Sequence, residues 1–251
     1  MKLFEKPVLF LTATISPHGM INTAIQDWKE RQRQYINAIG YYINRYPYNI
    51  VIVENSGKDL SPYFLDAINM GRIEFLTFNM NSINRELGKG YGEARIIEYG
   101  FQHSALLQKS DCIIKISGRH KVQNLSQIMK ISSFLMPPPT VDFIICDVNC
   151  HTQGAFSDCF IASSSFYEKY LIVEALQTDE SRGYWFEHAL YRSIYRAYKD
   201  GMKFISMPFP PKQNGISGSM GTKLHKPGIG KRLLNFAKMI SFQIGLIKLD
   251  K

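Results

Sequence analysis

Three nitrogen-bearing side chains, Arg119, His120 and Lys121, follow an apolar, β-branched run over residues 112–116 and a break at Gly118. An apolar run that ends abruptly in glycine and charge is typical of a central strand of an α/β sheet. Ligands of such sheets bind in the crevice beyond the carboxyl ends of the strands. Arginine and lysine at that place favour an anion, of which phosphate is the commonest. The alternative is a solvated basic turn.

A second candidate site lies in a polar loop predicted over residues 79–92, which closes in Lys89, Gly90 and Gly92 just before a helix over about 93–108. Glycines before a helix N-terminus let backbone amides approach a phosphate, and the helix dipole adds attraction. The spacing is neither that of a P-loop nor that of a dinucleotide-binding fingerprint. The alternative is a flexible loop whose glycines adopt positive φ.

Candidate general bases lie in the second half of the chain. Glu187 follows a polar loop at the start of a helix predicted over residues 184–199, and His188 comes next. Asp158 precedes a short strand over 159–162 and is the third candidate. Each could accept a proton from a substrate hydroxyl. The alternative for Glu187 is a carboxylate that only stabilises the positive end of the helix dipole.

The elements that must position these residues alternate between strand and helix. Apolar runs predict strands over residues 7–15, 49–53, 73–78, 112–116, 141–146, 159–162 and 203–207. Helical spacing predicts a first helix from Asn22 or Thr23 to about residue 46. It predicts further helices over residues 62–70, 93–108, 124–135, 164–176 and 184–199. This alternation predicts a three-layer α/β/α fold around a mainly parallel sheet.

Composition narrows the functional classes. The 251 residues carry a net charge of +9, but residues 223–251 hold seven Lys or Arg against one Asp, so the rest of the surface is too weakly basic for nucleic acid. The four cysteines form no CxxC pair, which favours a reducing cytoplasm. A zinc site from Cys146, Cys150, His151 and Cys159 matches no common spacing. We expect neither a signal peptide nor a membrane-spanning segment.

The basic C-terminal segment predicts an amphipathic helix over residues 229–247. Ile229, Leu233, Phe236, Ala237, Ile240, Ile244 and Ile247 fall on one face, and Lys231, Asn235, Lys238 and Ser241 fall on another. Such a helix is typical of an interfacial anchor on an anionic membrane. The alternatives are a helix that packs on the domain and an oligomer contact.

Four places in the chain resemble the GT-A class of nucleotide-sugar glycosyltransferases, in particular small bacterial enzymes that build capsule or O-antigen polysaccharide. The resemblance covers about residues 7–225. The first strand with Thr12 resembles the nucleotide-binding strand, and Glu54, Asn55 and Ser56 resemble the turn that contacts the base. The strand over 112–116 occupies the place of the strand that ends in a metal-binding DXD motif. Glu187 and His188 resemble the xED motif, and His225 matches a C-terminal histidine.

The resemblance implies a nucleotide-sugar donor, a glycan or lipid-linked acceptor, and a cytoplasmic protein held on the inner face of the membrane. It places residues 1–225 in one catalytic domain, with a donor half over about 1–122 and an acceptor half over 123–225, followed by the helical segment 226–251. Donor phosphates would contact Lys89, Lys115, Ser117, Arg119 and Lys121, helped by Lys223 and His225.

The chain departs from this class where the DXD motif belongs. It has Ser117-Gly118-Arg119 there, which supplies no pair of carboxylates for Mg²⁺ or Mn²⁺. We therefore predict an inverting, metal-independent transferase with no cofactor, whose leaving group is neutralised by cationic side chains. The fallback for a metal is Asp147 with Asn149. The competing functions are a non-catalytic nucleotide- or anion-binding homologue and a nucleotidyltransferase.

Overall fold

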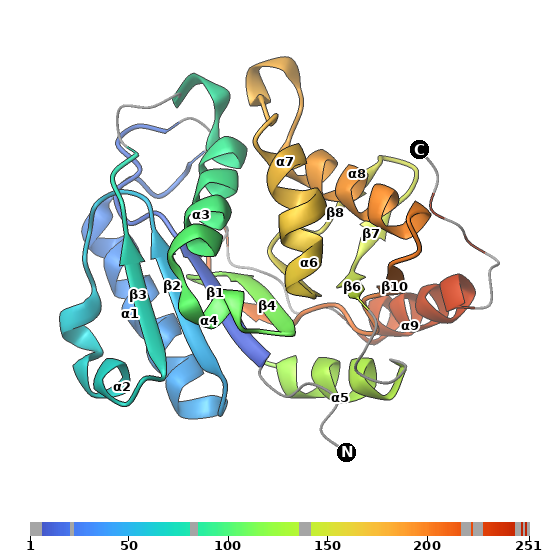
Figure 1. The fold of residues 1–251 in the computed structure, drawn as a ribbon, viewed down its shortest axis with the longest axis horizontal. Helices are drawn as coiled ribbons and strands as arrows, with labels where there is room; N and C mark the ends of the chain where they lie inside the picture. Colours follow the sequence, from blue (N-terminus) through green and yellow to red (C-terminus); the bar gives the residue numbers. More distant parts are fainter. Residues whose placement is uncertain are drawn as a thin grey trace.

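The computed structural model of the protein describes residues 7–20, 23–80, 85–135, 142–216, 222, 228–243, 247 and 249. In these ranges, seven strands form one sheet in the order β10-β6-β9-β4-β1-β2-β3 (Figure 1). They are β1 (Pro7–Ala13), β2 (Asn49–Glu54), β3 (Ile73–Thr77), β4 (Cys112–Ser117), β6 (Phe143–Cys146), β9 (Cys159–Ala162) and β10 (Lys203–Ser206). β9 pairs antiparallel with β4 and β6, and the other pairings are parallel.

Helices cover both faces of this sheet. They are α1 (Trp28–Arg45), α2 (Leu65–Asn69), α3 (Lys89–His103), α4 (Ala105–Gln108), α5 (Leu125–Leu135), α6 (Ser164–Phe166), α7 (Ile172–Ala175), α8 (Phe186–Lys199) and α9 (Ile229–Gln243). A π-type turn joins α6 to α7. One buried cluster joins the sheet to α1, α2 and α5, and a second joins it to α3, α4 and α6–α8. The predicted three-layer α/β/α fold with a mainly parallel sheet is confirmed.

Strand direction brings the candidate residues to one edge of the sheet. β1, β4 and β6 end at this edge, whereas the antiparallel β9 begins there. The register therefore sets Ser117 beside Asp158, and the backbone N–H of Ser117 donates to the Asp158 carbonyl at 2.9 Å. Gly118 passes so close to β1 that a Cβ there would lie 2.8 Å from the Thr12 carbonyl oxygen. Only glycine fits between these two strand ends.

Two local predictions were wrong. The first long helix starts at Trp28 rather than near Asn22 or Thr23, because the side chain of Asp27 accepts the amide of Lys29 at 2.9 Å and caps the helix there. Residues 89–92 are the first turn of α3, not a loop, and Gly88 at φ 90° is its cap. Gly90 is needed inside this turn, since a Cβ would lie 3.1 Å from the backbone nitrogen of Phe186.

Short strand pairs complete the edge. β5 (Lys121–Val122) continues from the turn after β4 and pairs antiparallel with β11 (Gln213–Asn214), so the segment after β10 returns to this edge. β7 (Val148–Asn149) pairs with β8 (Gly154–Ala155) in a hairpin that leads to Asp158.

Candidate active site

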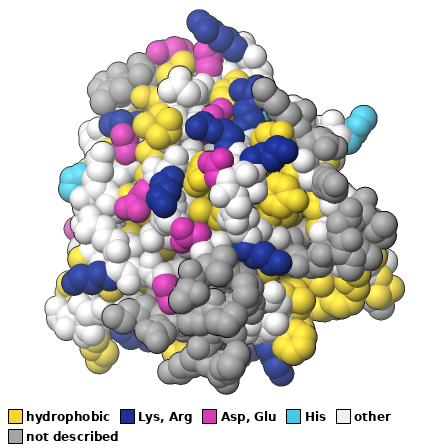
Figure 2. All heavy atoms as spheres, turned by 45° about the vertical axis from the view of Figure 1, so that its right-hand side comes forward, with side chains coloured by type: hydrophobic (Ala, Val, Ile, Leu, Met, Phe, Trp, Pro, Cys, Tyr) yellow, Lys and Arg dark blue, Asp and Glu magenta, His cyan; other side chains and the backbone are white. Residues whose placement is uncertain are grey.

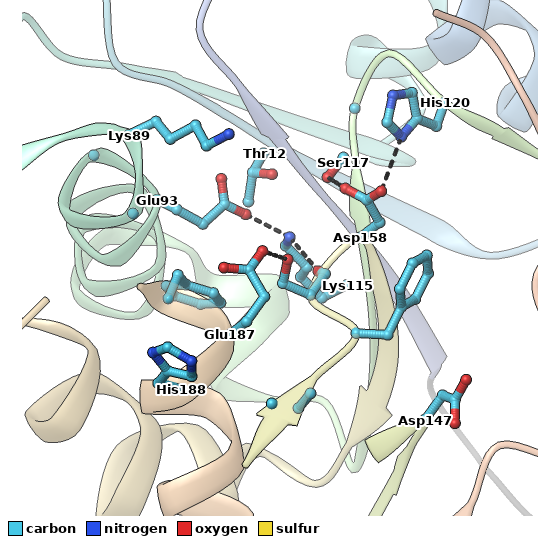
Figure 3. Close-up of a pocket in the computed structure, with 18 of the residues that line it drawn as sticks. Thr12, Lys89, Glu93, Lys115, Ser117, His120, Asp147, Asp158, Glu187 and His188 are labelled. Carbon is cyan, nitrogen blue, oxygen red and sulfur yellow. Dashed lines mark hydrogen bonds and ion pairs between the residues drawn. The ribbon is translucent and has the colours of Figure 1, made fainter. Parts of the chain in front are cut away.

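A cavity of about 880 Å³ opens at the carboxyl edge of the sheet (Figure 3). Its walls come from the ends of β1 and β4, the first turns of α3 and α8, the segment before β9, and α9. This is the crevice that the sequence predicts for an α/β sheet. Its volume suits a ligand of the size of a nucleotide.

Two arginines meet at the α1 side of this cavity. Arg31, from α1, is 5% exposed and its Nε donates to the carbonyl of Thr14 at 2.8 Å. Arg119 Nη1 donates to Oε1 of Gln34 at 2.9 Å. Burial lowers the pKa of Arg31 from its ordinary value, and the nearby charge of Arg119 acts in the same direction. Neither guanidinium forms an ion pair with a carboxylate in the described part of the chain, so an anion bound here would relieve their repulsion.

The three residues after β4 that carry nitrogen-bearing side chains do not all line the cavity. Arg119 lines the cavity, but Lys121 does not, because its ammonium donates to Asn37 of α1 at 2.7 Å and lies over the Tyr41 ring. His120 lines the cavity and is 4% exposed. Burial is the main cause that lowers its pKa, against the opposing effect of Asp158, so the ring is neutral at neutral pH. The expectation that all three side chains point into the crevice is corrected for Lys121, and of the two that line the cavity Arg119 carries the positive charge.

The residues at the end of β2, Glu54, Asn55 and Ser56, hold neighbouring backbone in place and do not line the cavity. The buried carboxylate of Glu54 accepts backbone amides from Ile15, Ser56 and Lys58 at 2.8–2.9 Å, and burial raises its pKa. Asn55 accepts the Thr14 hydroxyl at 2.7 Å, and Ser56 accepts the amide of Ser16. These three residues do not line the cavity, whereas Thr12 does. They fix the segment after β1, and contact with a base stays a prediction.

The first turn of α3 reaches the cavity with Lys89, Gly90 and Gly92. The amide of Gly90 donates to Glu180 Oε1 at 2.8 Å, so a protein carboxylate already sits where a phosphate was predicted. Glu180 is 8% exposed, which makes this a buried cap for the positive end of the helix. A phosphate on these amides would have to displace Glu180.

A chain of polar contacts crosses the floor of the cavity (Figure 3). The Lys115 side chain is 1% exposed, and its ammonium lies 2.5 Å from Glu93 Oε1 of α3 and donates to the carbonyl of Ser157 at 2.7 Å. The Ser157 hydroxyl in turn donates to Glu187 Oε1 at 2.8 Å. Lys115, predicted to bind phosphate, therefore uses its charge within the protein and fixes the segment that holds Glu187.

The Glu187 side chain is exposed in the cavity, whereas the His188 ring takes part in capping a helix. Glu187 lies in the first turn of α8. His188 Nδ1 accepts the backbone N–H of Trp185 at 3.4 Å and so helps to cap the same helix. The geometry favours Glu187 over His188 as a base.

Asp158 stands at the strand end itself. Its Oδ1 accepts the Ser117 hydroxyl at 2.8 Å, and its Oδ2 lies 3.8 Å from Nδ1 of His120 (Figure 3). One carboxylate oxygen thus faces the neutral imidazole, and Asp158 lines the cavity together with Glu93 and Glu187.

The residues at the predicted metal positions do not suit a divalent cation. Ser117 donates its hydroxyl to Asp158, and Arg119 adds a positive charge two residues on. In the fallback pair, Lys238 of α9 lies 2.7 Å from Asp147, while Asn149 accepts the amide of His151 at 3.0 Å. No group of three His, Cys, Asp or Glu side chains in the described residues could hold a metal, and this includes the cysteines considered for zinc. Lys223 and His225 lie outside the described residues.

Sequence reasoning missed Arg31, Glu93, Ser157, Glu180 and Lys238 as cavity residues. Arg31 precedes Tyr35 by four residues and Ile39 by eight, a spacing that indicates the buried face of its helix. Glu93 and Glu180 carry no comparable local signal, because their partners are distant in the sequence.

Comparisons with known proteins give only remote structural similarities. No protein-family model matches the chain, and no curated protein matches its sequence. A mannosyltransferase from Pyrobaculum calidifontis, solved with GDP-mannose and Mn²⁺, aligns with 98% of this chain at 10% identity and a TM-score of 0.47, and the chain spans 66% of its length. A glycosyltransferase involved in the glycosylation of the major capsid of PBCV-1 aligns with 80% of this chain and 81% of its own, at 10% identity and a TM-score of 0.44.

A cytidylyltransferase from Leptospira borgpetersenii also aligns, with 98% of both chains, 10% identity and a TM-score of 0.44. Nucleotide-sugar glycosyltransferases and nucleotidyltransferases thus both occur among the similar structures. Similarities this low do not distinguish a glycosyltransferase from a nucleotidyltransferase.

Proposed function

We propose that the protein transfers a glycosyl group from a nucleotide-sugar donor to a glycan or lipid-linked acceptor, with inversion and without a metal, in the synthesis of a bacterial surface polysaccharide. The observation that supports the proposal is that positive and negative side chains line different parts of the cavity wall. Two arginines with no described carboxylate partner meet on its α1 side, and Glu187 is held by Ser157 on the α8 wall.

Glycosyl transfer from such a donor has two electrostatic requirements. The departing nucleoside diphosphate gains negative charge, and the acceptor hydroxyl loses a proton. Arg119 and Arg31 provide fixed positive charge for the first, and Glu187 provides a carboxylate for the second. Arginine suits the first role because its planar fork matches phosphate oxygens.

Activity is expected to survive EDTA. The reason is the donor set at the strand end, where Ser117 and Arg119 replace a pair of carboxylates and Asp147 is paired with Lys238. Donor cleavage is measured with and without the chelator. Complete loss, restored by Mn²⁺, would move the metal to Asp147 with Asn149, or to Asp158, and contradict the metal-free mechanism.

Arg119→Ala is expected to lower turnover about 10²–10³-fold, because it removes a charge that acts on the leaving group. The fold should persist, since the side chain lines the cavity and bonds only to Gln34 among the described residues. Lys121→Ala is the matched control, two residues away and outside the cavity, and should stay near wild type. Equal effects of the two changes would remove the anion site from this strand end.

Donor identity is tested by thermal shift with UDP-, GDP-, CMP- and dTDP-sugars, followed by assays of nucleotide release. Stabilisation by one nucleotide-sugar, lost in Arg119→Ala, is the expected result. Binding without cleavage or transfer would indicate the non-catalytic homologue. Release of pyrophosphate from a nucleoside triphosphate would indicate a nucleotidyltransferase. Absence of any nucleotide binding would contradict the proposal as a whole.

A further inference from the structure

Helix α9 turns Asn235 and Lys238 toward the domain, whereas Lys231 is exposed. Asn235 is 6% exposed, and Lys238, predicted on the same polar face, lies 2.7 Å from Asp147 in the cavity wall. Met239 is buried in the core, and the Phe242 ring meets Phe204 of β10 edge-on at 5.3 Å. The helix therefore packs on the domain, which was one of the predicted alternatives, and it does so with Asn235 and Lys238 of the predicted polar face.

The outer face of α9 is apolar. Leu233 is 66% exposed, Leu234 68%, Ile240 41% and Phe236 38%, and Ala237 lies among them. Figure 2, which brings this side of the molecule forward, shows hydrophobic side chains gathered at its lower right. Four large apolar side chains exposed together on one helix are unusual for a surface that meets only water.

The charge around this helix indicates what covers it. Residues 223–251 carry Lys or Arg at seven positions against Asp250 alone, and among the described residues of this segment Lys238 is paired with Asp147. Exposed apolar side chains within a segment that carries excess positive charge match an anionic lipid surface. A second copy of this chain would bring the same positive charge to the interface and would be repelled. No helix in the described residues is long and apolar enough to cross a bilayer.

We infer that the outer face of α9 docks the protein on an anionic lipid surface, with Leu233, Leu234, Phe236 and Ile240 inserted among the lipids. Docking through α9 would also set where the cavity lies relative to the lipid surface. Lys238, Phe242 and Ile247 line the cavity, so the helix that meets the lipid is also a wall of the cavity. Docking would hold the cavity beside the surface. The inference that the acceptor is lipid-linked rests on the proposed function, whereas the docking itself does not.

The test is flotation with vesicles of phosphatidylcholine alone and of phosphatidylcholine mixed with phosphatidylglycerol. The full-length protein is expected to float with the mixed vesicles and to be released by high salt, which screens the basic segment. Leu233→Ser combined with Ile240→Ser should weaken binding at least about tenfold. The matched control is Leu65→Ser with Val173→Ser, because these apolar side chains are also exposed but lie on α2 and α7.

Each outcome decides the proposal without reference to catalysis. The α9 variant should retain its thermal stability and its donor binding, since the changed side chains face outward. Loss of flotation in the α9 variant alone supports docking through this helix. Failure of the wild-type protein to float, or equal flotation of all three proteins, would overturn it. A dimer in size-exclusion chromatography that the α9 variant abolishes, without flotation, would assign the face to a second copy instead.

Discussion

Glu187→Gln is expected to lower glycosyl transfer by about 10²–10⁴-fold while donor binding stays near wild type. The change removes the proton acceptor without altering the shape of the side chain, and a positioned base contributes about this much to a rate. The Ser157 hydroxyl can still donate to the amide oxygen of glutamine, so the local geometry is kept. Transfer is measured as product formed from a bound nucleotide-sugar, and binding by thermal shift.

A matched control separates catalysis from helix stability. Glu30 also lies in the first turn of its helix, α1, but outside the cavity. Glu30→Gln removes the same kind of carboxylate from a helix N-terminus and should leave transfer unchanged. If Glu187→Gln stays active while His188→Ala or Asp158→Asn is inactive, the base belongs to the other residue and the assignment to Glu187 fails.

The parts of the fold that the sequence predicted are those with local patterns. β1, β2 and β4 are apolar runs that end in polar residues, and their places along the chain were predicted to within two residues. The register of β9 against β4 has no local pattern, because the pairing joins segments about 40 residues apart. It is this register that brings Asp158 to Ser117.

The site was harder to predict than the fold because its charges are paired over long distances. A lysine in an apolar strand suggested a ligand, yet Lys115 meets Glu93 from α3. A glycine-rich helix start suggested a phosphate, yet Gly90 meets Glu180. Spacing shows which residues share a face, but it does not show which partner a buried charge has. Arg119, which forms no ion pair with a described carboxylate, is the cationic residue after β4 for which the prediction and the geometry agree.

The buried pair of Lys115 and Glu93 leads to the prediction with the largest expected effect on stability. Lys115→Met is expected to lower the free energy of unfolding by about 3–5 kcal/mol, because it leaves the Glu93 carboxylate without its partner in a largely buried place. Urea unfolding measures the loss. Arg95→Met, which breaks an ion pair on the same helix between partly exposed side chains, should cost about 1 kcal/mol or less.

A second variant shows whether the unpaired charge is the cause. Glu93→Gln added to Lys115→Met should recover much of the lost stability, since no charge is then left unpaired. Transfer should not recover with it. The ammonium of Lys115 also holds the carbonyl of Ser157, and that contact is absent in both variants, so Glu187 loses its fixed neighbour. A double variant that regains full activity would show that Lys115 stabilises the fold but does not position the base.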